Sequence, residues 1–175
     1  WSEARDIILD SFSSFHPEIS NLAKLFFKNN WIDASLRKGK ASGAFAHPSV
    51  PSLHPFILVN YQGKIRDVMT LAHELGHGVH QILAGKNGLL MAETPLTLAE
   101  TASVFGEMLV FRKLLDESPI EQKKQLLSGK IEDMLNTVAR QIGFHQFEVK
   151  FHEARKKSEL TPDEISDIWM ETQSH

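Results

Sequence analysis

Two histidines four residues apart, with a glutamate directly after the first, form the pattern His73-Glu74-Leu75-Gly76-His77. Residues four apart lie on one face of a helix, so both imidazoles can reach a single ion. Zinc accepts neutral imidazole nitrogens, and tetrahedral geometry leaves room for a third protein ligand and a water. Glu74 lies about 100° further round the helix, where it can act on that water as a general base. The pattern predicts two ligands and one base; the alternative is a surface helix with an ordinary histidine pair.

A third ligand must come from another part of the chain. The acidic residues downstream are Glu93, Glu100 and Glu107, at intervals of seven. Pro95 disfavours a continuous helix through Glu93, which we expect in a loop. Glu100 and Glu107 lie two turns apart on one face of the next helix, so both could point at the histidines. Antiparallel packing of the two helices favours Glu100 slightly, and either residue could instead be a solvated helix glutamate.

Two further residues are candidates for contacts with substrate or with the ligands. His80 shares a helix face with His73 and His77, but it lies about 10 Å along the axis from His73. One tetrahedral ion cannot easily take all three imidazoles, so we expect His80 to be a neighbour of the site or a plain helix-face histidine. Tyr61, the single tyrosine of the chain, is the other candidate.

Composition excludes several classes of protein. The chain has 175 residues, of which 19 are Lys or Arg and 22 are Asp or Glu, which gives a net charge of −3. This balance argues against a polybasic nucleic-acid-binding or membrane-surface protein. Cysteine is absent, which excludes disulfides, thiolate metal sites and cysteine nucleophiles. With apolar runs too short to span a bilayer and no targeting signal, we expect a cytoplasmic location.

Patterning predicts a mainly α chain with one extended interlude. Helical spacing begins at Ser2, and Pro17 favours the first turn of a second helix. Gly and Pro residues exclude regular helix between residues 38 and 55. Two short strands are predicted near there, at residues 44–46 and 56–61.

The rest of the chain reads as helix. A helix over about residues 65–84 carries the histidine pattern. Three capping boxes follow, each a Ser or Thr with Glu three residues later. They start at Thr97, Ser118 and Thr161, and they predict a helix to about residue 116, a long helical region and a final short helix.

The motifs resemble a known family, the M3 metallopeptidases. The matching residues are His73-Glu74-Leu75-Gly76-His77-Gly78-Val79-His80 and Ala99-Glu100-Thr101-Ala102-Ser103. They look in particular like oligoendopeptidase F, whose wider group includes thimet oligopeptidase and neurolysin. Segments at residues 31–33, 39–44, 54–63 and 140–148 also resemble oligoendopeptidase F, so the similarity extends over about residues 31–148.

The resemblance implies more than the residues do alone. It makes Glu100 the third ligand of one Zn²⁺ ion and places Glu107 beside the metal-binding histidines. It implies a zincin-type helical core, in which a metal helix and a ligand helix follow a small β element. Family members run to several hundred residues, and this chain begins at Trp1 without Met. We therefore expect residues 1–175 to be one piece of a catalytic domain, truncated at both ends and lacking a later segment with His and Tyr residues.

The predicted function is zinc-dependent hydrolysis of peptide bonds in short oligopeptides, with Glu74 as general base. Short peptides are the expected partners, without nucleic acid or membrane. The strand around residues 56–61 could add an extended peptide to its edge, or be a plain buried strand. The alternative function is a zinc-binding but inactive module that binds peptides or has a structural role, and another is a helical interaction module without metal. The intact Glu74 favours the enzyme.

Overall fold

The computed structural model describes residues 1–173 of the chain. It contains α1 (Ser2–Phe15), α2 (Pro17–Lys28), β1 (Ile32–Asp33), β2 (Phe45–His47), β3 (Phe56–Leu58), α3 (Ile65–Gly85), α4 (Leu96–Glu117), α5 (Ile120–Arg155) and α6 (Pro162–Gln173). The prediction of a mainly α fold, with a small β element before the metal helix, is confirmed. The chain forms two compact units, Trp1–Glu117 and the part from Ser118 onwards. The expectation that all 175 residues belong to one piece of a single domain stays a prediction.

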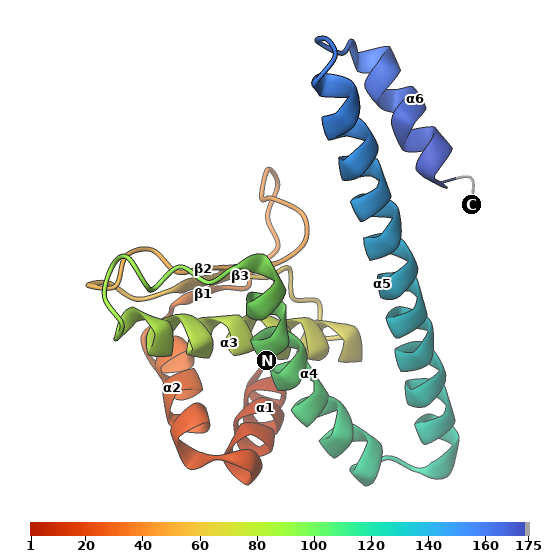
Figure 1. Ribbon diagram of the computed structural model, residues 1–175. Helices are drawn as coiled ribbons and strands as arrows, with labels where there is room; N and C mark the ends of the chain where they lie inside the picture. Colours follow the sequence, from red (N-terminus) through yellow and green to blue (C-terminus); the bar gives the residue numbers. More distant parts are fainter. Residues whose placement is uncertain (174–175) are drawn as a thin grey trace. The chain divides into compact units, whose positions relative to one another are not determined.

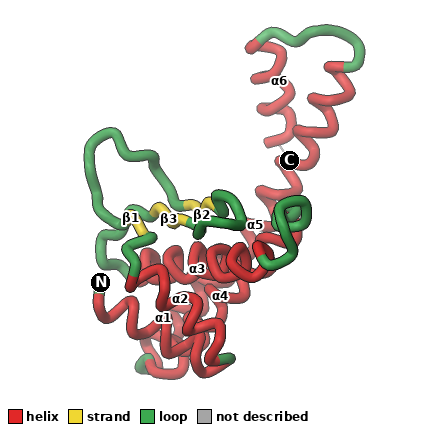
Figure 2. Tube along the Cα trace, turned by 90° about the vertical axis from the view of Figure 1, so that its left-hand side faces the viewer, coloured by secondary structure: helices red, strands yellow, loops and turns green. Residues whose placement is uncertain are grey.

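Helix α3 is the centre of the first unit. It lies between the small sheet on one side and helices α1 and α2 on the other (Figure 1), and the turned view of Figure 2 shows the same layers. Its apolar residues Val68, Leu71, Leu75 and Val79 recur at helical spacing and are buried. They pack with fully buried side chains of α1, α2 and β3, which are Ile8, Phe12, Phe26 and Ile57.

The start of α3 is fixed by a side chain in its own first turn. The Asp67 carboxylate accepts hydrogen bonds from the backbone N–H groups of Lys64, at 3.0 Å, and Gln62, at 2.7 Å. These bonds satisfy donors at the helix entry and place a negative charge at the positive end of the helix dipole. His73 and His77 are thereby carried on a helix with a defined first residue, and the helix predicted over about residues 65–84 is present.

The sheet has the strand order β1-β3-β2. β1 pairs with β3 in parallel, with Ile32 opposite Ile57, and β2 pairs with β3 antiparallel, with Ala46 opposite Ile57. The prediction that the strand around residues 56–61 offers an edge to a peptide is therefore wrong for β3, because neighbouring strands occupy both of its edges. The alternative, a buried strand, fits Ile57, which is 1% exposed.

The buried side chain of Lys40 forms hydrogen bonds to backbone segments in and next to the sheet. The side chain of Lys40 is 2% exposed, and its Nζ donates to the carbonyl oxygens of Val59, at 2.7 Å, Ser35, at 2.8 Å, and Asp33, at 2.9 Å. It also forms an ion pair of 3.1 Å with the Asp33 carboxylate. One ammonium group thus donates hydrogen bonds to carbonyl oxygens of β1, of the loop after β1 and of the segment after β3.

Two of the three predicted capping boxes differ from the structure. Helix α4 begins at Leu96, so Thr97 lies inside its first turn and does not cap it. Pro119 is the N-cap of α5, in place of Ser118, because its fixed φ suits the residue before a first turn. The third box is confirmed: the Glu164 carboxylate accepts from the Thr161 N–H at 2.8 Å, and Thr161 Oγ1 accepts from the Glu164 N–H at 3.3 Å.

The second unit is a pair of helices, α5 and α6. Aromatic rings join them: Phe144 and Phe147 of α5 both contact Trp169 of α6, with ring centroids 5.7 and 5.4 Å apart. Among residues 1–173, no helix combines the length and the apolar character that crossing a bilayer requires. The cytoplasmic location stays a prediction.

Candidate metal centre

Helices α3 and α4 pack backbone against backbone in the site region. A Cβ atom on Gly76 would lie 2.6 Å from the carbonyl oxygen of Ala102, and one on Gly106 would lie 3.0 Å from the carbonyl oxygen of Ala72. Later residues of α4 therefore lie against earlier residues of α3, so the helices run antiparallel where they cross. Glycine at both points allows the backbones to approach closely, which brings α4 side chains within reach of the histidines.

Three predicted ligands meet at this crossing. Glu100 Oε2 lies 3.3 Å from His73 Nε2 and 3.6 Å from His77 Nε2. One ligand atom from each of the three residues lies within 4.8 Å of the other two. His73 and His77 come from successive turns of α3, and their rings are 5.0 Å apart at 83°. The antiparallel packing considered from the sequence is thus present, and it brings Glu100 to both Nε2 atoms.

The donor set fits a zinc ion. Bonds of about 2.0–2.1 Å in a tetrahedral site place ligand atoms roughly 3.3–3.4 Å apart. The 3.3 and 3.6 Å separations between Glu100 and the two imidazoles are close to this spacing. Two histidines with one glutamate are also a donor set that catalytic zinc sites use, because they leave one position free.

Glu107 approaches His73 from the other side of its ring. Its Oε2 lies 3.3 Å from His73 Nδ1, while Nε2 of the same ring faces Glu100. Burial lowers the pKa of His73, but the hydrogen bond to Glu107 and the charges of Glu74 and Glu100 outweigh it and raise the pKa overall. Nδ1–H donation to Glu107 would leave the Nε2 lone pair for a ligand.

Glu74, on α3, is buried, with 6% of its surface exposed. Burial raises its pKa to about 7, the positive charge of His73 lowers it, and the negative charge of Glu100 raises it further. A carboxylate whose pKa is near neutral can both take up and release a proton under physiological conditions. The side chain that the sequence singles out as a base therefore has the electrostatics of one.

The two remaining candidates do not join the three ligand atoms. His80 is half-buried one turn after His77 and lies outside the group that could share an ion. Burial lowers the pKa of His77, and the positive charges of His73 and His80 lower it further against the opposing charge of Glu100. Tyr61 contacts Trp1, with ring centroids 5.1 Å apart. Burial and the charges of Asp67 and Glu3 raise the pKa of its hydroxyl.

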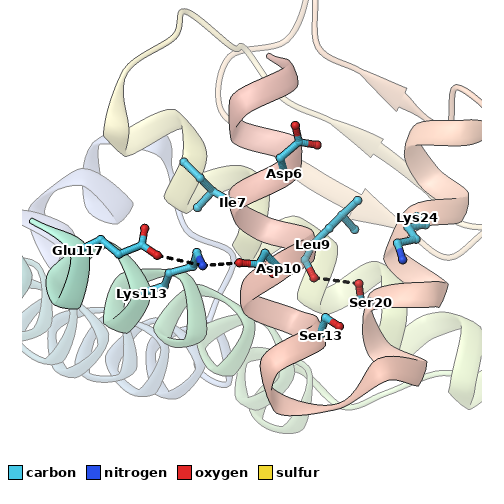
Figure 3. A pocket seen from close by; sticks show the side chains of 9 residues that line it. All are labelled: Asp6, Ile7, Leu9, Asp10, Ser13, Ser20, Lys24, Lys113 and Glu117. Carbon is cyan, nitrogen blue, oxygen red and sulfur yellow. Dashed lines mark hydrogen bonds and ion pairs between the residues drawn. The ribbon is translucent and has the colours of Figure 1, made fainter.

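A separate surface hollow of about 590 Å³ lies among α1, α2 and α4, as Figure 3 shows. Lys113 forms ion pairs with Asp10 and Glu117 there. None of the histidines of α3 lines this hollow, so it is separate from the candidate metal centre.

Sequence reasoning missed one side chain of the site. Ser103 entered as the last residue of the motif at residues 99–103, with no polar contact of its own predicted, whereas its Oγ donates to Glu100 Oε2 at 2.8 Å. The sequence could have indicated this contact, because Ser103 lies three residues after Glu100 and residues three apart on a helix share a face.

Relatives of known name cover most of this chain. Oligoendopeptidase F (chromosomal) of Lactococcus lactis subsp. cremoris is 36% identical over 153 residues, which are 86% of this chain and 25% of the relative. The oligopeptidase PepF of Bacillus subtilis is 30% identical over 174 residues, which are 97% of this chain and 26% of the relative. The chain thus spans about a quarter of the length of these relatives.

Solved structures show the same architecture. A Chlamydophila abortus protein, provisionally described as a peptidase, is 32% identical with a TM-score of 0.74, and the match covers 98% of this chain and 29% of that one. PZ peptidase A with an inhibitor is 19% identical with a TM-score of 0.80, and the match covers 97% of this chain and 30% of that one. At 19% identity, the similarity to PZ peptidase A shows a shared fold and nothing more.

Residues 10–175 match the profile of the family described as peptidase family M3. The matched range contains the α3 and α4 residues that meet at the crossing. The resemblance seen in the motifs is therefore confirmed, and this chain belongs to peptidase family M3.

Proposed function

We propose that this chain carries the metal-binding and proton-transferring part of a zinc-dependent peptidase that cleaves short peptides. The observation that carries the proposal is the convergence of Glu100 Oε2 on the Nε2 atoms of His73 and His77, at 3.3 and 3.6 Å. Membership of peptidase family M3 supports the peptidase class, and the relatives named oligopeptidases support short peptides as substrates.

His73, His77 and Glu100 would hold the ion. When bound, zinc would supply a Lewis acid that polarises the scissile carbonyl and makes water more acidic. Glu74, on the same turn of α3 as His73, is not one of these three groups. Its carboxylate would therefore remain available to accept and donate a proton. A tetrahedral ion held by three protein groups has one position left for substrate or water.

Glu74 is proposed to move the proton. Its carboxylate would take a proton from the attacking water and then pass it to the nitrogen of the leaving amine. Burial holds the pKa of Glu74 at about 7, between that of an ordinary carboxyl group and that of an amine, which suits a group that must do both. The low exposure of its side chain also keeps bulk water from competing for the proton.

Glu107 is proposed to orient His73. By accepting a hydrogen bond at Nδ1, 3.3 Å away, it would fix the tautomer in which Nε2 carries the lone pair. The proposed roles are thus three ligands, one base and one orienting carboxylate. His80 and Tyr61 stay candidates for contact with substrate.

The test compares Glu74→Gln with the unmodified protein, each loaded with zinc. Quenched fluorescent peptides report cleavage, and elemental analysis reports bound zinc. We expect Glu74→Gln to retain zinc and to lose at least about 100-fold in cleavage rate, the range of one general base. Glu18→Gln, an exposed change on α2, is the control and should cleave at the unmodified rate. An unmodified protein that binds zinc without cleaving peptides would instead indicate the inactive module, and cleavage by Glu74→Gln at full rate would refute the base.

A further inference from the structure

We propose that Ser103 is a positioning residue that holds the Glu100 carboxylate in its metal-binding orientation. The inference rests on the proposed metal site and adds a residue to it. Ser103 Oγ donates a hydrogen bond of 2.8 Å to Glu100 Oε2. This is the same oxygen that lies 3.3 Å from His73 Nε2 and 3.6 Å from His77 Nε2. One hydroxyl therefore contacts the atom on which both imidazoles converge.

Glu100 needs such a partner because its own surroundings restrain it little. Its side chain is 49% exposed, whereas those of His73 and His77 are 26% and 14% exposed. A half-exposed glutamate has three rotatable bonds, and ordering it costs conformational entropy when the ion binds. A donor that already selects one rotamer lowers this cost, so the ligand is preorganised.

Ser103 is itself held rigidly. It is 0% exposed and lies at the crossing of α3 and α4, where a Cβ on Gly76 would be 2.8 Å from its Cα. Gly76 is the residue directly before His77. The hydroxyl is therefore fixed relative to the same stretch of α3 that carries the two imidazoles, so it can transmit that fixed geometry to Glu100.

The Ser103 hydroxyl has one proton to donate, and two oxygen atoms of Glu100 lie within hydrogen-bond distance of it. Its Oγ also lies 3.0 Å from the backbone carbonyl oxygen of Glu100, the usual local partner of a serine inside a helix. An ionised carboxylate is the stronger acceptor of the two, because hydrogen bonds to charged groups are stronger than those between neutral groups. The carbonyl contact keeps the hydroxyl on the correct side of the helix, and the proton goes to Oε2.

The experiment measures the zinc dissociation constant of Ser103→Ala by competition with a chromogenic chelator. We expect zinc binding to weaken by about 10- to 100-fold, the usual effect of losing a group that orients a metal ligand. Melting in excess EDTA reports the stability of the metal-free protein. Ser11→Ala is the matched control: Ser11 is 4% exposed on α1, and its Oγ donates to the Ile7 carbonyl at 2.7 Å. It should lose similar metal-free stability and keep the zinc affinity of the unmodified protein.

A double variant separates positioning from general packing. In a Glu100→Ala background there is no carboxylate to hold, so adding Ser103→Ala should leave zinc affinity unchanged within about twofold. The inference is overturned if Ser103→Ala alone binds zinc like the unmodified protein, or if it weakens binding equally in both backgrounds. Failure of the unmodified protein to bind zinc would overturn the proposed metal site, and this inference with it.

Discussion

Gly76 of α3 and Ala102 of α4 approach so closely that a Cβ on Gly76 would lie 2.6 Å from the Ala102 carbonyl oxygen. Real Cβ atoms do not come this near to backbone oxygen, so any side chain at residue 76 must push the two helices apart. Because His73 and His77 lie on one helix and Glu100 on the other, the spacing at Gly76 sets the spacing of the three proposed ligands.

Gly76→Ala is predicted to weaken zinc binding and destabilise the fold together. Overpacking a buried contact costs about 1–3 kcal/mol, and we expect a loss of stability in that range by urea unfolding. Gly129→Ala makes the same chemical change on α5, where the new Cβ meets nothing within 4 Å beyond its chain neighbours and the neighbouring backbone of its own helix. This control should gain about 0.5–1 kcal/mol, because alanine is the better helix former. Equal stability of the two variants would show that the close approach at Gly76 does not constrain the helices.

Glu107→Gln is predicted to weaken zinc binding by about 10-fold, with little change in the melting temperature of the metal-free protein. The amide of the variant would keep a neutral acceptor near His73 Nδ1, which lies 3.3 Å from the present Oε2, but lose the charge that makes the imidazole a stronger ligand. Glu117→Gln, on the same helix but 60% exposed, is the control. A zinc dissociation constant unchanged by Glu107→Gln would exclude the orienting role.

The stability of the metal-free protein is predicted to depend on the ionisation of Glu74. Its pKa is about 7 in the folded protein, against an ordinary value of 4.5. Below pH 4.5 both states are protonated and the raised pKa costs nothing. As the pH rises to 7 the unfolded chain ionises first, so the folded state loses stability, and above pH 7 the loss is constant.

Glu74→Gln removes this titration and tests its sign. With EDTA present, the free energy of unfolding of the variant relative to the unmodified protein should rise by about 2–3 kcal/mol between pH 4 and pH 8. Chemical unfolding at a series of pH values gives this difference, in which ionisations common to both proteins cancel. If the difference in free energy of unfolding between the two proteins stays constant or falls as the pH rises, folding does not raise the pKa of Glu74.

Lys40→Met is predicted to destabilise the first unit by about 3 kcal/mol. The methionine fills most of the space but removes the Lys40 donor from the carbonyls of Ser35 and Val59 and the charge that pairs with the Asp33 carboxylate, while the Asp33 carbonyl keeps its bond from the Val59 N–H. Lys86→Met is the control, because Lys86 is 64% exposed and its ion pair with Glu18 is 4.0 Å long. The control should stay within about 0.5 kcal/mol of the unmodified protein, since exposed pairs contribute little. Similar unfolding midpoints for both variants would contradict a stabilising role of the buried ammonium.

Local sequence signals predicted those features that depend on residues close together in the sequence. The helix over residues 65–84, the start of α2 at Pro17 and the Thr161 capping box rest on periodicity or on side chains a few residues away. The box at Thr97 was wrong because it assigned the Glu100 carboxylate to the helix's own N-terminus. In the folded protein that carboxylate faces His73 and His77, so a contact from another helix took the place of a local one.

The position of a strand within the sheet was also beyond local reasoning. Residues 56–58 form a strand, as predicted, but the two-residue strand β1 lies beside it and removes the expected free edge. Ile32 and Asp33 are too few to show an alternating pattern. Their pairing depends on the chain returning from far along the sequence.

The sequence by itself determined the donor types, their four-residue spacing and the helix that carries them, because helical geometry makes positions four apart neighbours. It left Glu100 and Glu107 as near equals, since residues seven apart on one helix present the same face. The resemblance to a known family favoured Glu100, but only the tertiary structure gives the physical reason: the antiparallel crossing at Gly76 places Glu100 at the Nε2 atoms and Glu107 at Nδ1 of His73. The rotation and approach of two packed helices depend on contacts distant in sequence, which no local pattern encodes.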